Sequence, residues 1–300
     1  MSLFEAIILG LIQGLTEFLP VSSSAHLRIA GELLPSATDP GATFTAITQL
    51  GTEAAVLVYF WGDITRIIGK WFRHFGSGSR RATSVGEGTT RRSTTVGSAV
   101  IEKNDPDVRM GWLIIIGTIP IVIAGFLLQD AIRGALRSLW LVAIVLIVFG
   151  IILGIADLLG RRGKSLNDIT YRDGILFGLA QMLALIPGVS RSGATTTMGR
   201  VLGYQRPAAA EYAFLLAVPA VFGSGLYELY NSITEPDASA PFGYLETALA
   251  TLVAFGVGLA VIAFLMNYIK KHSFLPFVIY RLLLGGTLIV LLSTGVLPPL

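Results

Sequence analysis

The sequence predicts an all-α, polytopic integral membrane protein, and three observations support this fold class. The chain has 300 residues, of which 53% are hydrophobic and only 14% are charged, whereas about a quarter are charged in a soluble domain. Apolar stretches near membrane-spanning length recur along the whole chain. Because the backbone must satisfy its own hydrogen bonds in lipid, helices are expected, and the long unbroken stretches argue against a β-barrel.

Six stretches are predicted to be transmembrane helices, and two others are interrupted. The interrupted stretches, about Leu3–Leu34 and Ile175–Leu202, carry Pro, Gly and Ser in the middle. Each interruption predicts a re-entrant helix-loop-helix segment, which is tolerated where protein or a water-filled cavity surrounds it. The six predicted spans are about Phe44–Trp61, Gly111–Gln129, Leu139–Leu159, Ala208–Leu229, Tyr244–Asn267 and Phe277–Val296.

The basic residues predict the orientation in a cell (plasma) membrane. They concentrate in Trp61–Met110, in Gly160–Arg172 and at Lys270–Lys271, whereas Tyr230–Gly243 and the C-terminal tail have no Lys or Arg. The positive-inside rule places the three basic segments in the cytoplasm. This clustering informs topology and does not indicate a nucleic-acid partner.

Two other segments bear on the topology. The short loop with Arg133 and Arg137 is predicted to lie outside, and it is the one exception to the charge pattern. The polar stretch Gly76–Asn104, about residues 76–105, is rich in Ser, Thr, Gly and Arg. Its composition predicts a disordered cytoplasmic loop that links the spans on either side.

An inverted repeat within a single membrane domain, residues 1–300, follows from this topology. Six spans fit the charge pattern only if both interrupted stretches are re-entrant, and the first then enters from outside and the second from the cytoplasm. Repeat 1 is then about 1–160 and repeat 2 about 173–300. Identical residues recur at a constant offset of 168: Gly10 and Gly178, Leu11 and Leu179, Gln13 and Gln181, Leu15 and Leu183, Val21 and Val189, Ser22 and Ser190, and Ser24 and Ser192. Such repeats commonly place a site near the midplane, between the halves.

The second interruption, "PGVSRSGATTT" at Pro187–Thr197, has the chemistry of an anion site. Pro and Gly end one half-helix, and the N-terminus of the next offers unpaired N–H groups. Arg191 adds a permanent charge whose planar shape matches phosphate oxygens. An arginine at membrane depth costs at least about 2.5–3.5 kcal/mol, so it requires a partner. Anion binding is the favoured interpretation, and a structural ion pair is the alternative.

The first interruption, "QGLTEFLPVSSSAH" at Gln13–His26, supplies complementary groups. Gln13 and Glu17 share a helical face, and three serines precede His26. A buried histidine is often purely structural, but here carboxylate and hydroxyl groups lie nearby in the sequence. One interruption thus offers an anion clamp, and the other a general base and candidate nucleophiles. Phosphoryl transfer on a lipid phosphate is the predicted chemistry, because positioning and charge neutralisation dominate it.

These two motifs resemble the undecaprenyl-diphosphate phosphatase family, also called the bacitracin-resistance family. "QGLTEFLPVSSSAH" fits an (E/Q)xxxE motif followed by a serine run and His, and "PGVSRSGATTT" fits PGxSRSxxT. Similar segments are "ITQLG" at Ile47–Gly51, "EYAFLLAVP" at Glu211–Pro219 and "FLPFVIYR" at Phe274–Arg281. The resemblance covers nearly the whole chain in order.

The resemblance implies a membrane hydrolase. Its substrate would be a C55 polyprenyl diphosphate, and its products the monophosphate and inorganic phosphate, which recycles the lipid carrier for cell-wall and other surface polysaccharides. It also implies two re-entrant regions, an active site that faces outside, and dependence on a divalent cation, Mg²⁺ or Ca²⁺.

Site residues follow from the same resemblance. Glu17, Ser23, His26 and Arg191 are the candidate catalytic residues. The resemblance implies a base or a nucleophile at His26 and a nucleophile at Ser23, and the sequence does not choose between these two nucleophiles. In one mechanism Ser23, activated by His26, attacks the terminal phosphorus, and in the other His26 activates a water. Glu17 orients His26 or, with Gln13, holds the metal; Gln13 stands where many members have Glu, which removes one charge. The candidate diphosphate-binding residues are Ser190, Arg191, Ser192, Gly193 and Thr195. The candidate cavity residues are Gln49, Glu53 and Gln181. Of these, Glu53 belongs to no motif of the resemblance, and it is expected to line the cavity or to pair with a basic group.

Two other functions compete with hydrolysis. Inverted repeats with broken helices are typical of transporters, so a flippase for the polyprenyl phosphate needs the anion clamp but no nucleophile. A non-enzymatic membrane scaffold would leave the cost of the buried charges unexplained. The sequence leaves open whether the chain forms a homodimer in the bilayer.

Overall fold

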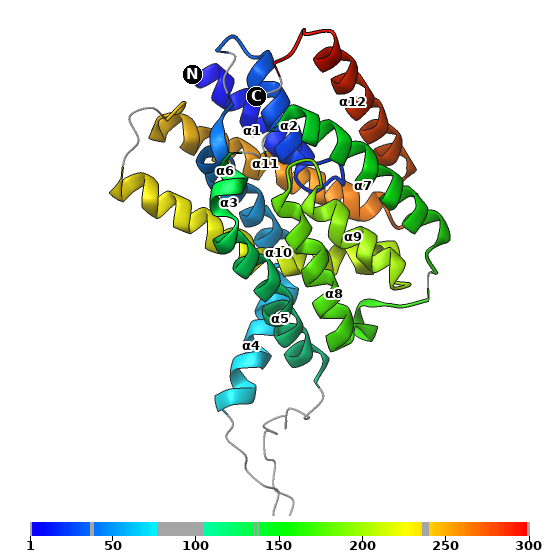
Figure 1. The fold of residues 1–300 in the computed structure, drawn as a ribbon. Helices are drawn as coiled ribbons and strands as arrows, with labels where there is room; N and C mark the ends of the chain where they lie inside the picture. The colour runs from blue at the N-terminus through cyan, green and yellow to red at the C-terminus, as the bar shows by residue number, and fades with distance from the viewer. Residues whose placement is uncertain are drawn as a thin grey trace, which may run out of the picture.

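The computed structural model describes residues 2–36, 39–76, 105–134, 136, 138–161, 163–235 and 240–298, and in these ranges the regular structure is helical (Figure 1). The helices are α1 Leu3–Thr16, α2 Ser23–Leu33, α3 Gly41–Tyr59, α4 Trp61–Gly76, α5 Pro106–Leu127, α6 Gln129–Arg133, α7 Leu139–Leu159, α8 Tyr171–Met182, α9 Arg191–Val201, α10 Arg206–Thr234, α11 Tyr244–Tyr268 and α12 Leu275–Ser293, with short 3₁₀ turns η2 Leu166–Asp168 and η3 Leu183–Leu185. The predicted loop falls almost wholly outside these ranges, at residues 77–104, as does Arg137.

Five helices are long and apolar enough to cross a membrane: α5, α7, α10, α11 and α12. The predictions of an all-helical fold and of a multi-pass membrane protein are therefore confirmed. The remaining predicted span, Phe44–Trp61, forms helix α3, but polar residues lower its hydropathy. Thr48, Thr52 and Glu53 of this helix are all fully buried, so its polar face turns into the protein and not toward lipid.

Helix α4 was not anticipated from the sequence, and acidic residues at the start of α5 hold it in place. The Lys70 ammonium lies 2.7 Å from the carboxylate of Asp107 and 3.0 Å from that of Asp105. Hydrogen bonds to Asp107 and then to Asp105 raise the pKa of Lys70. Asp105 also caps the N-terminus of α5, since its side chain accepts from the amide of Asp107.

Both interrupted stretches fold into two short helices joined by a turn, and the second helix of each pair begins in the same way. Ser22 precedes α2 with φ 73°, and Ser190 precedes α9 with φ 71°; in the described ranges these are the two residues other than glycine with positive φ. The Ser22 hydroxyl accepts from the amide of Ala25, and the Ser190 hydroxyl from the amide of Gly193. A serine in this left-handed region is strained, and the cap that it provides offsets part of that cost.

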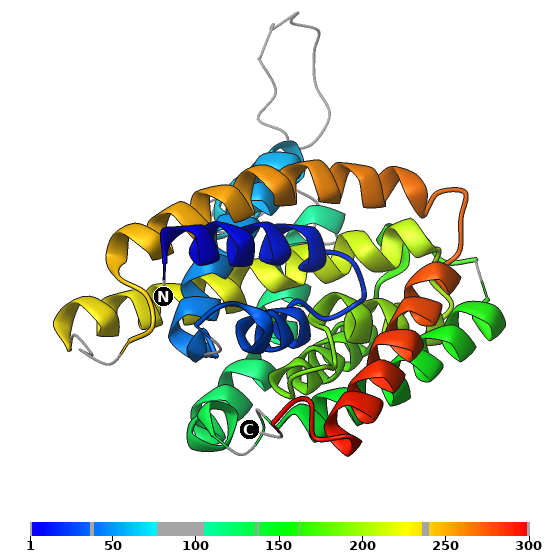
Figure 2. The same cartoon turned by 90° about the horizontal axis from the view of Figure 1, so that it is seen from above.

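The interrupted stretches pack on distant partners. Helix α1 lies along α11, and α8 lies along α5, while α3 packs on α10 and α7 on α12. Figure 2 shows α1 beside α11, and Figures 1 and 2 both show α12 beside α7. At the closest approaches a Cβ on Gly10 would lie 2.5 Å from the carbonyl oxygen of Ala250, and one on Gly178 would lie 2.4 Å from that of Gly117. These glycines let the helix backbones touch.

Substitution of Gly178 by Ala is expected to lower the thermal unfolding midpoint in detergent, because the new methyl group meets backbone on α5 and overpacking costs about 1–3 kcal/mol. The matched control is Gly256→Ala, also within a helix, where an added Cβ has nothing within 4 Å. Helix propensity alone favours alanine in both variants. Equal midpoints for the two variants would contradict close packing at Gly178.

Candidate active site

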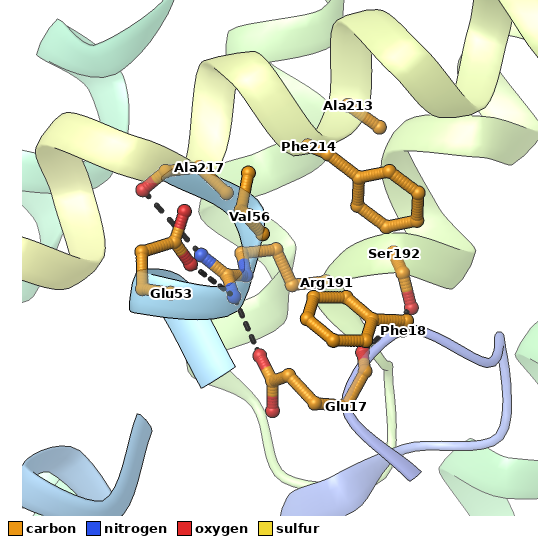
Figure 3. Close-up of a pocket in the computed structure, with 9 residues that line it drawn as sticks. All are labelled: Glu17, Phe18, Glu53, Val56, Arg191, Ser192, Ala213, Phe214 and Ala217. Atoms are coloured by element: carbon orange, nitrogen blue, oxygen red, sulfur yellow. Dashed lines mark hydrogen bonds and ion pairs between the residues drawn. The ribbon is translucent and has the colours of Figure 1, made fainter. Parts of the chain in front are cut away.

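The two interruptions meet at Arg191, the first residue of α9. Its Nη2 atom lies 2.5 Å from Oε1 of Glu17, at the end of α1, and 3.5 Å from Oε2 of Glu53 on α3. Its Nη1 atom donates to the carbonyl oxygen of Ala217 in α10, at 3.5 Å. Figure 3 shows the guanidinium between the two carboxylates. The structure therefore brings the two motifs, which are far apart in the sequence, into one ion-paired cluster.

The other oxygen of the Glu17 carboxylate accepts two hydrogen bonds from its own interruption. The Ser23 hydroxyl donates to Oε2 at 2.6 Å, and the Gln13 amide donates to the same atom at 2.7 Å. A carboxylate that accepts a serine hydroxyl at this distance is positioned to take its proton. Glu17 is thus the carboxylate that faces Ser23, and Gln13 donates to the same oxygen.

His26 is placed differently from the prediction. Its Nδ1 atom lies 2.7 Å from the carbonyl oxygen of Ser22, and its Nε2 atom lies 2.7 Å from the hydroxyl of Tyr280. Since a carbonyl can only accept, Nδ1 carries the proton in the neutral ring and Nε2 accepts from Tyr280. The two rings stack, with centroids 5.5 Å apart and planes 6° apart.

These contacts bear on two of the predicted roles of His26. Among the described residues, His26 makes its hydrogen bonds to Ser22 and Tyr280 and none to Ser23 or Glu17. Activation of Ser23 by His26 and orientation of His26 by Glu17 therefore have no hydrogen bond behind them in this arrangement, and both stay predictions. The physical reason is direction: His26 is the fourth residue of α2, and its ring turns back to the Ser22 carbonyl and out toward α12.

Several of the predicted diphosphate-binding residues shape the first turn of α9. The Thr195 hydroxyl donates to the carbonyl oxygen of Arg191 at 2.7 Å, and the Ser190 hydroxyl accepts from the amide of Gly193 at 3.1 Å. The Ser192 hydroxyl lies 3.2 Å from the carbonyl oxygens of both Glu17 and Leu19, so it ties the interruptions together. Of this set, Arg191 has the side chain that reaches both carboxylates, and that side chain is 14% exposed.

Of the three candidate cavity residues, the structure places Glu53 in the cluster. Glu53, Glu17, Arg191 and Ser192 line a cavity of about 10 Å³ together with apolar residues. This is close to the smallest space that holds one water molecule. Gln181 is fully buried, with both side-chain polar atoms lacking a partner in the described chain, and neither it nor Gln49 lines this cavity.

Arg281 of α12 was missed as a functional candidate, although its segment was noted. It is fully buried, and its guanidinium donates only to backbone carbonyl groups among the described residues. The acceptors are Pro20 at 3.2 Å, Gly188 at 2.8 Å, Val189 at 3.0 Å and Leu146 at 3.1 Å. One side chain therefore binds the turns of both interruptions and helix α7. The sequence did contain a signal for Arg281. An arginine at membrane depth is costly, and this argument applies to Arg281 as it does to Arg191.

The oxygen atoms of the cluster suit a hard cation. Oε1 of Gln13 and Oε1 of Glu53 are buried and lack a hydrogen-bond partner in the described chain. Amide and carboxylate oxygens are the ligands that Mg²⁺ and Ca²⁺ prefer. The described residues contain no group of three or more His, Asp and Glu side chains arranged around one point, so further ligands would have to be substrate oxygens or water.

The fold and the site together define a class: a helical membrane protein with an arginine–carboxylate cluster between two broken helices. A family profile described as "Bacitracin resistance protein BacA" matches residues 6–287. The chain belongs to this family.

Curated relatives match over almost their whole length. A Micrococcus luteus protein named undecaprenyl-diphosphatase is 60% identical over 297 residues, which is 99% of each chain. A Clavibacter michiganensis protein of the same name is 59% identical over 98% of each chain. An Agrobacterium fabrum protein named undecaprenyl-diphosphatase 2 is 55% identical over 99% of this chain and 98% of its own.

Replacement of Arg281 by Met is expected to lower the unfolding midpoint in detergent strongly, because each buried carbonyl left without a donor costs about 1–3 kcal/mol. Arg281→Lys should recover only part of the loss, since one ammonium cannot reach acceptors on three segments. Arg206→Met, at a partly exposed arginine that binds Asp157, is the comparison. A midpoint for Arg281→Met at or above that of Arg206→Met would show that the four backbone contacts contribute little.

Proposed function

We propose that this protein is a membrane phosphatase that hydrolyses undecaprenyl diphosphate to undecaprenyl phosphate and inorganic phosphate. The observation that carries the proposal is the continuous chain of contacts from the Ser23 hydroxyl through the Glu17 carboxylate to the Arg191 guanidinium. These are a nucleophile, a base and an anion clamp. The names of the relatives supply the substrate, and the five membrane-crossing helices supply the lipid setting.

The reaction begins when terminal phosphate oxygens replace the Glu17 oxygen on Arg191. Ser23 then attacks the terminal phosphorus, and its proton passes to Glu17 as the Oγ–P bond forms. The bond from that phosphorus to the bridging oxygen breaks, and the leaving lipid monophosphate takes the proton from Glu17. A water molecule then gives a proton to Glu17 and attacks the phosphorus of the phosphoserine. The Oγ–P bond breaks, Ser23 recovers its proton from Glu17, and inorganic phosphate leaves. Arg191 stabilises the charge on the transferred group throughout, which is the main requirement in phosphoryl transfer.

A divalent cation, Mg²⁺ or Ca²⁺, belongs to this proposal. Glu17 and Gln13 would hold it, and it would neutralise part of the diphosphate charge. The orphaned Oε1 atom of Gln13 supports such a role.

The finer topology is also proposed. Helix α3 would be the sixth span, and the pairs α1–α2 and α8–α9 would be re-entrant segments of an inverted repeat, about 1–160 and 173–300, within one membrane domain. The matching geometry of Ser22 and Ser190 supports the repeat. Helix α1 packs on α11, and α8 packs on α5. In each case a helix of one repeat contacts a helix of the other, which also supports the repeat. The loop charges favour a site that faces outside the plasma membrane.

A flippase is the less favoured function. A transporter that moves polyprenyl phosphate needs Arg191 but has no use for a serine bonded to a base. The contact between Ser23 and Glu17, at 2.6 Å, therefore favours hydrolysis.

Phosphate release from undecaprenyl diphosphate by purified protein tests the proposal. Glu17→Gln, Ser23→Ala and Arg191→Ala should each lose at least about 100-fold in kcat/KM, because each removes a group used in the transition state. Ser24→Ala is the matched control for Ser23→Ala, since Ser24 bonds to Ser22 and not to Glu17. His26→Ala should retain more activity than Ser23→Ala. Lipid binding without phosphate release by the wild type would instead favour the flippase.

Labelling of single cysteines tests the orientation, and the chain has no cysteine of its own. Gly163→Cys and Glu235→Cys both place the thiol at an exposed position, on the two sides of the proposed membrane domain. In intact cells a membrane-impermeant maleimide should label only the Glu235→Cys protein, and permeabilised cells should give labelling of both. Labelling of only the Gly163→Cys protein in intact cells would reverse the orientation.

A further inference from the structure

Glu53 is a buried carboxylate for which the proposed mechanism has no use. It is fully buried on α3 and lines the same cavity as Glu17 and Arg191. Its Oε2 atom is 3.5 Å from the Arg191 guanidinium, which is the outer limit of a hydrogen bond, and its Oε1 atom has no partner in the described chain. A buried carboxylate is costly unless it is well paired. The structure leaves Glu53 only partly satisfied.

A second acceptor next to Glu17 is also without a partner. The amide nitrogen of Gln13 donates to Glu17, so its oxygen Oε1 is left as a buried, unpaired acceptor. Two residues that contact the Glu17–Arg191 pair thus each present an oxygen with no donor. Buried carboxylate and amide oxygens that lack a donor are ligands that Mg²⁺, Ca²⁺ or Mn²⁺ prefers.

The formal charge of the cluster gives an independent argument. The cavity lining contains the two carboxylates of Glu17 and Glu53, and Arg191 is the one cationic side chain among the residues that line it. A diphosphate carries at least two negative charges into this water-poor site. Charges that enter a low-dielectric site without partners are strongly disfavoured. Positive charge must therefore enter together with the diphosphate.

We infer that Glu53 is the second carboxylate ligand of the divalent cation that accompanies the diphosphate, and this inference rests on the proposed function. Glu53 and Glu17 lie on either side of Arg191, as Figure 3 shows. The cavity that they line is about 10 Å³, a size that suits one ion or one water molecule. When the phosphate takes Arg191, both carboxylates lose their common partner, and the cation replaces it.

Binding of Mn²⁺ to the purified protein in the presence of inorganic phosphate, which occupies Arg191 as the diphosphate would, tests the inference without turnover when it is followed by electron paramagnetic resonance. Glu53→Gln keeps the shape but removes the charge, and should raise the Kd for Mn²⁺ by about tenfold or more. Glu228→Gln is the matched control, because Glu228 also contacts α3 but through Thr43, and should leave the Kd unchanged. Glu53→Asp keeps the charge and should raise the Kd less than Glu53→Gln. It serves as the second variant if the glutamine protein does not fold.

Phosphate release measured over a range of Mg²⁺ concentrations separates the inference from the function on which it rests. The Glu53→Gln protein should require a higher Mg²⁺ concentration for half-maximal activity, and its activity should recover at high Mg²⁺. An unchanged Mn²⁺ Kd, together with stronger inhibition by inorganic phosphate, would overturn the inference and make Glu53 only a counter-ion of Arg191. Absence of phosphate release by the wild type would overturn the proposed function itself.

Discussion

The structure depends on one buried guanidinium that binds two turns. Arg281 donates to carbonyl oxygens of Pro20, Gly188 and Val189, and these residues lie in the two places where the helical hydrogen-bond ladder is interrupted. Backbone carbonyls freed by such turns require donors when water is scarce. By supplying them from one side chain, α12 fixes the distance between the interruptions. The positions of Ser23 and Arg191 follow from that distance.

The resulting site contains a buried cation and a buried carboxylate, and each of them requires a partner. Arg191 requires an anionic partner, and Glu17 requires donors, so in the absence of phosphate each satisfies the other at 2.5 Å. In the proposed mechanism, a phosphate group that arrives competes with Glu17 for Arg191. Because the same carboxylate also accepts from Ser23, the proposed steps of anion binding and serine activation share one residue.

Much of the fold could be predicted from the sequence, because hydropathy reports directly on helices in lipid. Helix α7 has the predicted bounds, Leu139–Leu159, and both interruptions fall where Pro, Gly and Ser predicted them. The site was predictable where a costly residue type is rare, as at Arg191. It was not predictable where the contact depends on rotamers: His26 follows the serine run, and only the geometry of α2 shows that its ring turns to Tyr280. Helix α4 was not predicted because the charged residues on one of its faces give this segment the composition of a loop.

Each interrupted stretch packs on a helix from the other half of the chain, and this sets the order in which native contacts can form during synthesis. Helix α1 lies on α11, whose contact residue Ala250 follows Gly10 by most of the chain. At a synthesis rate of about 5–20 residues per second, α1 waits on the order of 10 to 50 s for this partner. During that time its small-residue face and its carboxylates lack their final surroundings. Helix α1 thus emerges from the ribosome well before α11 and reaches its native contacts late, and it depends on lipid, water or the insertion machinery until then.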